Sequence, residues 1–117
     1  MAFSDILFSV EAGVARLTLN RPDKLNSFTG AMHTEVRTAL DQIQGDTSIR
    51  LLVLSGAGRG FCAGQDLADP QMAALDGRMP DIGNVVENHY KPLILRLQNL
   101  RVPTIAAVNG TAAGAGC

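Results

Sequence analysis

Short apolar runs alternate with turn-forming residues at the start of the chain. The runs Ile6 to Glu11 and Val14 to Leu19 flank the dipeptide Ala12-Gly13. Successive side chains of a strand point to opposite faces, so one face of the second run carries only Ala15, Leu17 and Leu19. This pattern predicts a β-hairpin. Pro22 ends it, because proline has no N–H to donate and disfavours helix at the residue before it.

Two longer segments show the three- and four-residue spacing of helices that pack on a sheet. The first begins at the candidate N-cap Thr29, stops near Gly45 and carries an apolar stripe of Phe28, Met32, Val36, Leu40 and Ile43. The second runs from about Gly83 to Leu100, and Pro92 should kink or split it.

Apolar runs at 51–54 and 104–108 predict two further strands, the first of them buried and the second opened by Pro103. Strand, strand, helix and strand without an internal repeat indicate an α/β layer architecture. Residues 69–83 contain two prolines and two glycines and are expected to form a mobile surface loop. Its apolar residues could line an acyl pocket or could make incidental contacts: Met72, Ala73, Ala74, Leu75 and Met79.

The composition narrows the choice of partners. A net charge of −1 and a pI near 6.0 leave no basic stripe, so nucleic acid and anionic membranes are not expected partners. No apolar run approaches the roughly 20 residues of a membrane-spanning helix, and no signal peptide is visible. The two cysteines, Cys62 and Cys117, fit no metal spacing or disulfide framework, which indicates a reducing cytoplasm.

Glycines at 56, 58, 60 and 64 follow the buried strand closely and let the backbone approach a ligand. N–H groups near Gly64 and Gln65 can then point at one polarised oxygen, as in an oxyanion hole. Thr111 to Cys117 follows the last strand and is expected to begin a helix, whose free N–H groups would supply a second donor. On glycine content alone, two ordinary tight turns remain an alternative.

Three motifs resemble those of the enoyl-CoA hydratase/isomerase (crotonase) superfamily: Asn20-Arg-Pro-Asp-Lys-Leu-Asn-Ser27, Gly60-Phe-Cys-Ala-Gly-Gln-Asp-Leu67, and Pro103-Thr-Ile-Ala-Ala-Val-Asn-Gly110 with Ala113-Gly-Ala-Gly116. They occur in family order and span the chain. Residues 63–69 and 112–116 are most similar to the ring-epoxide isomerases of bacterial phenylacetate breakdown. The resemblance implies an α/β fold with the crotonase-like ββα-spiral core.

The resemblance also implies a site. The backbone N–H groups of Gln65 and Ala115 would bind the thioester carbonyl of an acyl-CoA and stabilise its enolate. The other residues that it implies for CoA and thioester binding are Lys24, Leu25, Ser27, Ala63, Gly64, Asp66, Leu67 and Gly114. Without the resemblance, Lys24 would be a solvated loop lysine and Asp66 could cap a helical turn. Coenzyme A belongs to the substrate, so no separate cofactor is expected, and relatives imply a homotrimer or homohexamer.

Enolate chemistry requires a general base, usually a carboxylate. The resemblance implies that the carboxylates of hydratases follow directly after Cys117 and further on. Residues 1–117 are therefore expected to be the N-terminal part of one crotonase-like domain. Asp69, Asp81 and Glu87 are present but are expected to be solvated. His33 and His89 lack ligand or triad spacing, and Cys62 has no basic partner and should only fill the turn.

The favoured reaction is isomerisation of a ring-epoxide or unsaturated acyl-CoA, and activity of these 117 residues alone is left open. One alternative is an enoyl-CoA hydratase of fatty-acid β-oxidation. Another is a nucleotide-binding module, although Gly56-Ala-Gly58-Arg-Gly60 is not the G-x-G-x-x-G pattern. A third is a non-catalytic fragment that folds only within an assembly.

Overall fold

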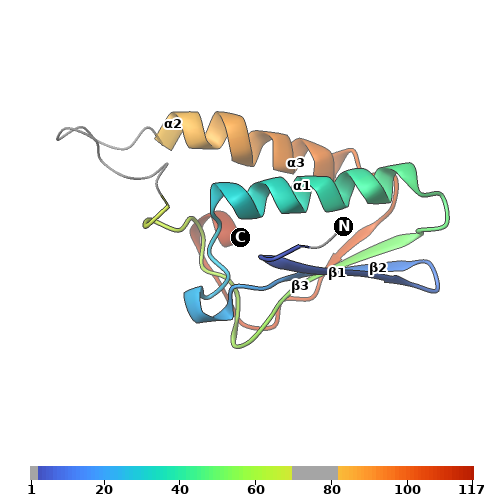
Figure 1. Ribbon diagram of the computed structural model, residues 1–117, viewed down its shortest axis with the longest axis horizontal. Coiled ribbons are helices and arrows are strands. Elements are labelled where there is room, and N and C mark those ends of the chain that lie inside the picture. The colour runs from blue at the N-terminus through green and yellow to red at the C-terminus, as the bar shows by residue number, and fades with distance from the viewer. Residues whose placement is uncertain (1–2, 70–81) are drawn as a thin grey trace.

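The computed structural model describes residues 3–69 and 82–117. Helices cover one face of a four-stranded sheet with strand order β1-β2-β3-β5 (Figure 1). The predicted acyl-pocket residues of the 69–83 loop lie outside the described residues. In the described part of the chain, no helix has the length and apolarity needed to cross a membrane.

The predicted hairpin is confirmed. Strands β1 (Ile6–Glu11) and β2 (Val14–Leu19) pair antiparallel, and Ala12 and Gly13 form the turn with positive φ angles of 52° and 80°. The face predicted to be apolar points into the core, where Ala15, Leu17 and Leu19 are buried.

Strands β3 (Leu51–Gly56) and β5 (Thr104–Ala106) extend the sheet by parallel pairing, β3 beside β2 and β5 beside β3. Strand β3 is longer than the sequence predicted, and strand β5 is two residues shorter than predicted. Only Leu52 of β3 is fully buried, so the expectation of a wholly buried strand was too strong. All of β5 is exposed, because it lies at the edge of the sheet.

Helix α1 (Gly30–Gly45) begins where the sequence predicts, since the Met32 N–H donates to the Thr29 hydroxyl at 3.2 Å. The helix ends at Gly45 as predicted, but Asp46 forms the C-cap. The core members that α1 contributes are Met32, Val36, Ala39, Leu40 and Ile43.

The second helical segment is continuous rather than split, and its hydrogen-bonding pattern changes just before Pro92. It consists of α2 (Ile82–Val85), a π-helical turn η3 (Val86–Tyr90) and α3 (Lys91–Gln98), with Pro92 in the first turn of α3. Proline has no N–H to donate, so it fits beside a π-helical turn, where the α-helical hydrogen-bonding pattern is already interrupted. The segment packs alongside α1 (Figure 1).

Two expectations for the glycine-rich stretches were wrong in detail. The stretch expected to be a loop contains β4 (Gly60–Cys62), and the stretch expected to begin a helix contains β6 (Thr111–Ala112) and a single 3-10 turn, η4 (Gly114–Gly116). Strands β4 and β6 pair parallel in a separate small sheet. Neither strand has a long apolar run, and their pairing depends on contacts between distant segments.

Candidate active site

The two predicted donor turns lie against each other because they follow paired parallel strands. Gly60 pairs with Thr111 and Cys62 with Ala112, and the Ala113 N–H donates to the Cys62 carbonyl at 3.0 Å. Parallel strands end at the same edge of a sheet, so the segments after β4 and β6 emerge side by side. In Figure 1 the C-terminal turn accordingly lies near the first turn of α1, beside the chain that follows β3.

Glycine makes this close approach feasible. A Cβ at Gly116 would overlap the carbonyl oxygen of Cys62. Gly64 has a φ of +110°, and a Cβ there would lie 3.5 Å from the Ala115 backbone nitrogen and 3.1 Å from the Ala113 oxygen. The backbone after β4 and the η4 turn are therefore in direct contact.

The N–H of Gln65 points away from its neighbouring segment. Phe28 forms an isolated parallel bridge with Gln65, in which the Phe28 N–H donates to the Gly64 carbonyl at 2.7 Å and the Asp66 N–H donates to the Phe28 carbonyl at 2.8 Å. In such a bridge the flanking residues make the hydrogen bonds, so the polar groups of the central residue face the opposite side.

The N–H of Ala115 is not used by the hydrogen bonds within its own turn. The hydrogen bonds that close η4 run from the Gly116 N–H to Ala113 at 2.8 Å and from the Cys117 N–H to Gly114 at 3.1 Å. The first N–H groups of a helical turn have no partner within it. Within the described residues, therefore, neither the Gln65 nor the Ala115 N–H takes part in the hydrogen bonds that hold its own turn.

The first motif supports the second through backbone and amide contacts. The Ala63 N–H donates to the Leu25 carbonyl at 3.0 Å, and Leu25 packs against Gly60. Asn26 is fully buried, and its side-chain amide donates to the carbonyls of Ala57 at 3.0 Å and Gly60 at 2.9 Å. Sequence reasoning did not select Asn26. Its positive φ of 58°, which asparagine tolerates better than most residues, is the local property that makes it suitable there.

An ion pair joins the same two motifs. The Arg21 guanidinium donates to the Asp66 carboxylate at 2.9 Å and to the Ser27 carbonyl at 2.5 Å. These side chains are mostly shielded from solvent, and the hydrogen bond from Arg21 lowers the pKa of Asp66. Asp66 also accepts the Ala68 N–H at 2.8 Å, in line with the capping alternative. Its carboxylate therefore holds the loop in place.

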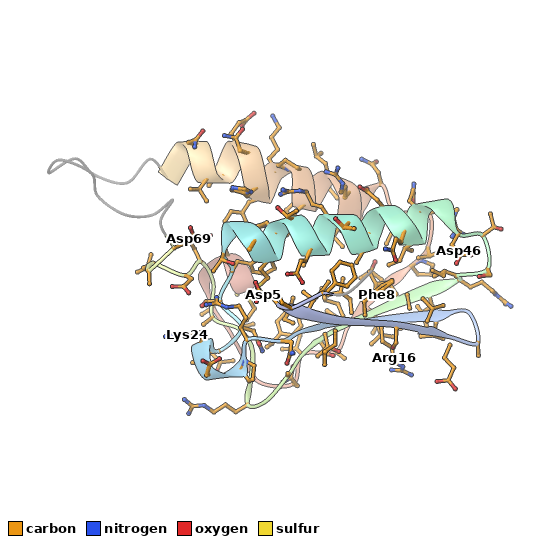
Figure 2. The ribbon with its side chains drawn as sticks, viewed as in Figure 1. Asp5, Phe8, Arg16, Lys24, Asp46 and Asp69 are labelled. Carbon is orange, nitrogen blue, oxygen red and sulfur yellow. The ribbon has the colours of Figure 1, made fainter. Side chains whose placement is uncertain are left out.

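The remaining predicted binding residues differ in exposure. Lys24 is exposed on the 3-10 turn η1 (Pro22–Lys24), at the same end of the molecule as Asp69 (Figure 2). Leu67 is 75% exposed and Gly114 is also exposed, with a φ of +54°. Ser27 is buried beneath this surface. The predicted residues thus form one continuous region with an exposed rim and a buried base.

The prediction for Asp69 was wrong. Its side chain is buried rather than solvated, and it accepts the Gly30 N–H at 2.7 Å. The amino end of a helix carries partial positive charge, so a carboxylate there is stabilising. Glu87 is exposed and pairs with Lys91 at 3.1 Å, as expected of a solvated charge. Asp81 lies outside the described residues.

A buried cluster of aromatic and imidazole rings borders Gln65. His33 is fully buried, and burial, followed by the nearby His89 and Arg37, lowers its pKa to about 4. Its ring lies 4.4 Å from the ring of Tyr90 and 5.1 Å from that of His89. The Tyr90 hydroxyl donates to Gln65 Oε1 at 2.5 Å. Sequence reasoning missed this cluster, although His33 continues the spacing of the apolar stripe of α1.

Cys62 lies in a strand, not in the turn that the sequence predicted. It is buried in β4, and burial raises the pKa of its thiol, so the thiol stays protonated at neutral pH. Its contribution to the site is its carbonyl, which anchors Ala113.

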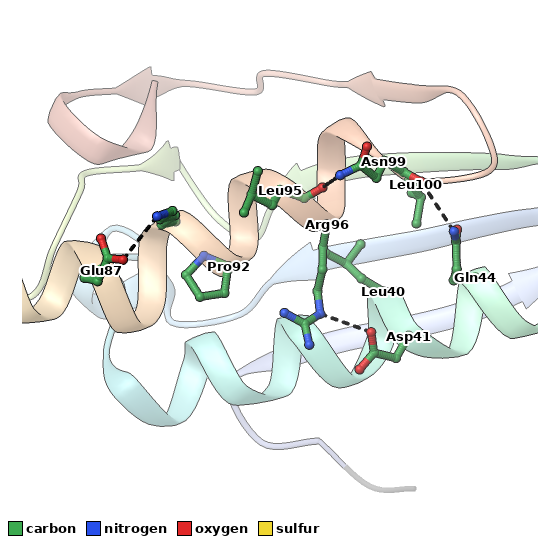
Figure 3. A pocket seen from close by; sticks show the side chains of 10 residues that line it. Leu40, Asp41, Gln44, Glu87, Pro92, Leu95, Arg96, Asn99 and Leu100 are labelled. Atoms are coloured by element: carbon green, nitrogen blue, oxygen red, sulfur yellow. Dashed lines mark hydrogen bonds and ion pairs between the residues drawn. The ribbon is translucent and has the colours of Figure 1, made fainter.

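The described part of the chain contains a surface groove and an apolar cavity. A groove of about 460 Å³ between α1 and α3 contains the Asp41–Arg96 ion pair at 3.1 Å (Figure 3). No predicted CoA-binding residue lines it. An apolar cavity of about 170 Å³ lies between the sheet and α3, and Ala115, Gly116 and Cys117 line one end. This volume is below the roughly 300 Å³ at which small-ligand pockets usually begin.

Sequence and structure comparisons agree on the family. The family model described as "Enoyl-CoA hydratase/isomerase" matches residues 9–117. The chain is 55% identical over 111 residues to the 1,2-epoxyphenylacetyl-CoA isomerase of Escherichia coli, covering 95% of this chain and 42% of that protein. It is 38% identical over 116 residues to a probable enoyl-CoA hydratase of Rhodobacter capsulatus, covering 99% of this chain and 42% of that protein.

Solved structures agree as well. An enoyl-CoA hydratase from Mycobacterium smegmatis superimposes with a TM-score of 0.85 at 33% identity, covering 98% of this chain and 44% of that one. A putative enoyl-CoA hydratase/isomerase from Mycobacterium abscessus gives 0.83 at 39% identity, covering 95% and 43%. The chain belongs to the enoyl-CoA hydratase/isomerase family and has its crotonase-like α/β fold, as the three motifs predicted. It spans less than half the length of the relatives it matches.

Proposed function

We propose that this chain contributes the thioester-binding part of an acyl-CoA enzyme. The backbone N–H groups of Gln65 and Ala115 both donate to the thioester oxygen and stabilise the enolate that forms when charge moves onto it. The observation that carries this proposal is the contact between the two turns, with both N–H groups outside the hydrogen bonds of their own turns. Each such donor typically contributes about 2.7 to 4 kcal/mol to transition-state stabilisation.

The rest of the CoA thioester lies along the first motif. We place the adenine and pantetheine beside Lys24, Leu25 and Ser27, where the exposed Lys24 ammonium supplies positive charge for the phosphates. Ala63, Gly64, Asp66, Leu67 and Gly114 surround the thioester. Coenzyme A enters as part of the substrate, and no other cofactor is needed for this chemistry.

The favoured reaction is isomerisation of a ring-epoxide or unsaturated acyl-CoA. It is supported by the identity of 55% with the Escherichia coli isomerase, against 38% with the Rhodobacter hydratase. Hydration of an enoyl-CoA is the second candidate, because the hydratase matches almost the whole chain. Both reactions require a carboxylate base, which we expect outside residues 1–117. A cytoplasmic homotrimer or homohexamer is part of this proposal.

The nucleotide-binding alternative is not supported by the fold. A dinucleotide fingerprint requires the glycine-rich turn to lead from a strand into a helix, whose amino end binds the pyrophosphate. Here the turn after β3 leads into β4. The Gly56, Gly58 and Gly60 backbone instead packs against Asn26, Pro22 and Leu25.

Isothermal titration with two matched ligands tests the proposal. The polypeptide as its host cell makes it is titrated with phenylacetyl-CoA and with the thioether analogue in which a methylene replaces the carbonyl. Loss of two backbone hydrogen bonds to the carbonyl oxygen, at about 1 kcal/mol each, should weaken binding of the thioether by at least about tenfold. Equal affinity for the two ligands would show that the thioester oxygen is not bound, and binding of neither would refute the acyl-CoA assignment.

A further inference from the structure

The side chain of Gln65 makes a contact that a simple backbone donor would not need. Its Oε1 accepts the Tyr90 hydroxyl at 2.5 Å, and its Nε2 donates to the Asp66 carbonyl at 3.3 Å. The backbone on both sides of Gln65 is bonded to Phe28. The peptide that carries the proposed donor is thus held from the Phe28 segment by its backbone and from the π-helical turn by its side chain.

Tyr90 is itself held firmly. It ends the π-helical turn η3, immediately before α3 and Pro92. Its ring meets the His33 ring edge-on, with the centroids 4.4 Å apart, and the Phe28 ring with the centroids 6.2 Å apart. π-helical turns are rare and frequently occur at functional sites. This one places a hydroxyl from a distant helix on the residue that carries the donor.

The hydroxyl keeps its proton in this setting. Burial raises the pKa of Tyr90, so the neutral phenol remains the donor across the physiological range. Neither ring nitrogen of His33 has a hydrogen-bond partner in the described part of the chain, and its lowered pKa keeps the ring neutral. His33 therefore packs against Tyr90 without competing for Gln65 Oε1.

From these contacts we infer that Tyr90 is a positioning residue, which sets the orientation of the Gln65 peptide and so aims its N–H at the thioester oxygen. The inference rests on the proposed function, because it assigns the N–H of Gln65 to the oxyanion. Such stabilisation depends on donors already oriented before charge develops, so a small rotation of the peptide lowers the rate more than it lowers substrate affinity. Tyr90 touches no reacting atom.

Kinetics of Tyr90→Phe, which retains the ring and removes the hydroxyl, test this role in the host-made polypeptide. We expect kcat to fall about tenfold with KM changed by less than about twofold, the pattern of a lost transition-state interaction. Gln65→Met removes the acceptor and should give the same loss. The double variant should be no slower than either single variant, because both remove one interaction. Thr38→Val removes a hydroxyl from the exposed face of α1 and should change nothing.

Backbone amide signals in the NMR spectrum separate this inference from the acyl-CoA proposal. In the free protein, Tyr90→Phe should shift the Gln65 amide signal, and Thr38→Val should leave it unchanged. An unmoved Gln65 signal, activity of Tyr90→Phe within about twofold of the parent, or losses that multiply in the double variant would each overturn the positioning role. Failure of the parent protein to bind any CoA thioester while the Gln65 signal moves would refute only the acyl-CoA proposal.

Discussion

The regions beside the two ends of α1 differ in how their backbone polar groups are used. At the carboxyl end, near Asp46, Nη2 of Arg101 lies within hydrogen-bond distance of three carbonyl oxygens, those of Ile43, Asp46 and Ile49. At the amino end, Asp69, which is labelled in Figure 2, accepts the Gly30 N–H. Beside it, the N–H groups of Gln65 and Ala115 stay outside the hydrogen bonds of their own turns. Side chains from distant segments thus satisfy the backbone of α1 at both ends, and the N–H groups beside the amino end are the ones that we propose for a ligand.

This difference distinguishes a structural end from a candidate site. Gln65 is partly exposed and Ala115 is exposed, so their N–H groups are accessible to solvent or to a ligand. The site end is well braced, by the Arg21–Asp66 pair and by the Asn26 amide. Its open donors are therefore held rigidly in place, and rigidity is what an oxyanion hole requires.

The largest effect should come from removing a donor at the site end. Gln65→Pro deletes the N–H and should lower kcat/KM about 10²- to 10³-fold, the usual consequence of losing one oxyanion donor. Gln65→Ala keeps the N–H and should lose no more than about tenfold, through the Tyr90 contact. Steady-state kinetics with an acyl-CoA substrate measure both. Equal losses from the two variants, with both proteins folded by circular dichroism, would contradict the backbone role.

An intermediate effect is expected at the structural end. Arg101→Met retains much of the aliphatic stem and removes the charged hydrogen bonds, so the free energy of unfolding should fall by up to about 3 kcal/mol. Activity per folded molecule should not change. Urea unfolding gives the first quantity and kinetics the second. Arg16→Met, on an exposed position of β2, removes an equal charge and should stay within about 0.5 kcal/mol of the parent. A matching loss there would show that general charge, not the Arg101 contacts, sets the stability.

The smallest effect is a pH dependence at the site end. His33 has a folded pKa near 4 and an ordinary value of 6.5, so below pH 6.5 the unfolded chain binds a proton that the folded one does not. Stability from this group is full above pH 6.5 and falls as the pH drops toward 4. The loss should be about 2 kcal/mol between pH 7.5 and pH 5. Urea unfolding at both pH values should show a shallower dependence for His33→Leu, and an unchanged dependence would refute the assignment.

Local signals predicted much of the fold. The alternation of apolar and polar residues predicted the hairpin, and the spacing of Met32, Val36 and Leu40 after the Thr29 cap predicted α1. Both features depend on residues that are close in sequence. The motifs gave the family and, with it, the candidate residues Gln65 and Ala115. A proline in a helical pattern marked the region where a π-helical turn precedes α3, although the helix is not split there.

Long-range contacts account for what the sequence did not predict. The β4–β6 pairing, the buried carboxylate of Asp69 and the Tyr90–Gln65 hydrogen bond all join segments between 25 and 51 residues apart, since 60 pairs with 111, 69 with 30, and 90 with 65. Asp69 in sequence resembles any loop aspartate; only the position of α1 makes it a cap. Likewise, no local pattern links a helical tyrosine to a loop glutamine.

The short distance between the two turns depends on glycine residues, which have no Cβ. Cβ atoms at Gly110 and Gly116 would overlap the carbonyls of Arg59 and Cys62, so main chain rests directly on main chain. The distance between the proposed donors is consequently independent of which side chains surround the acyl group. If the proposed donors bind the carbonyl, substitutions can reshape those surroundings for a new substrate without changing the two hydrogen bonds to it.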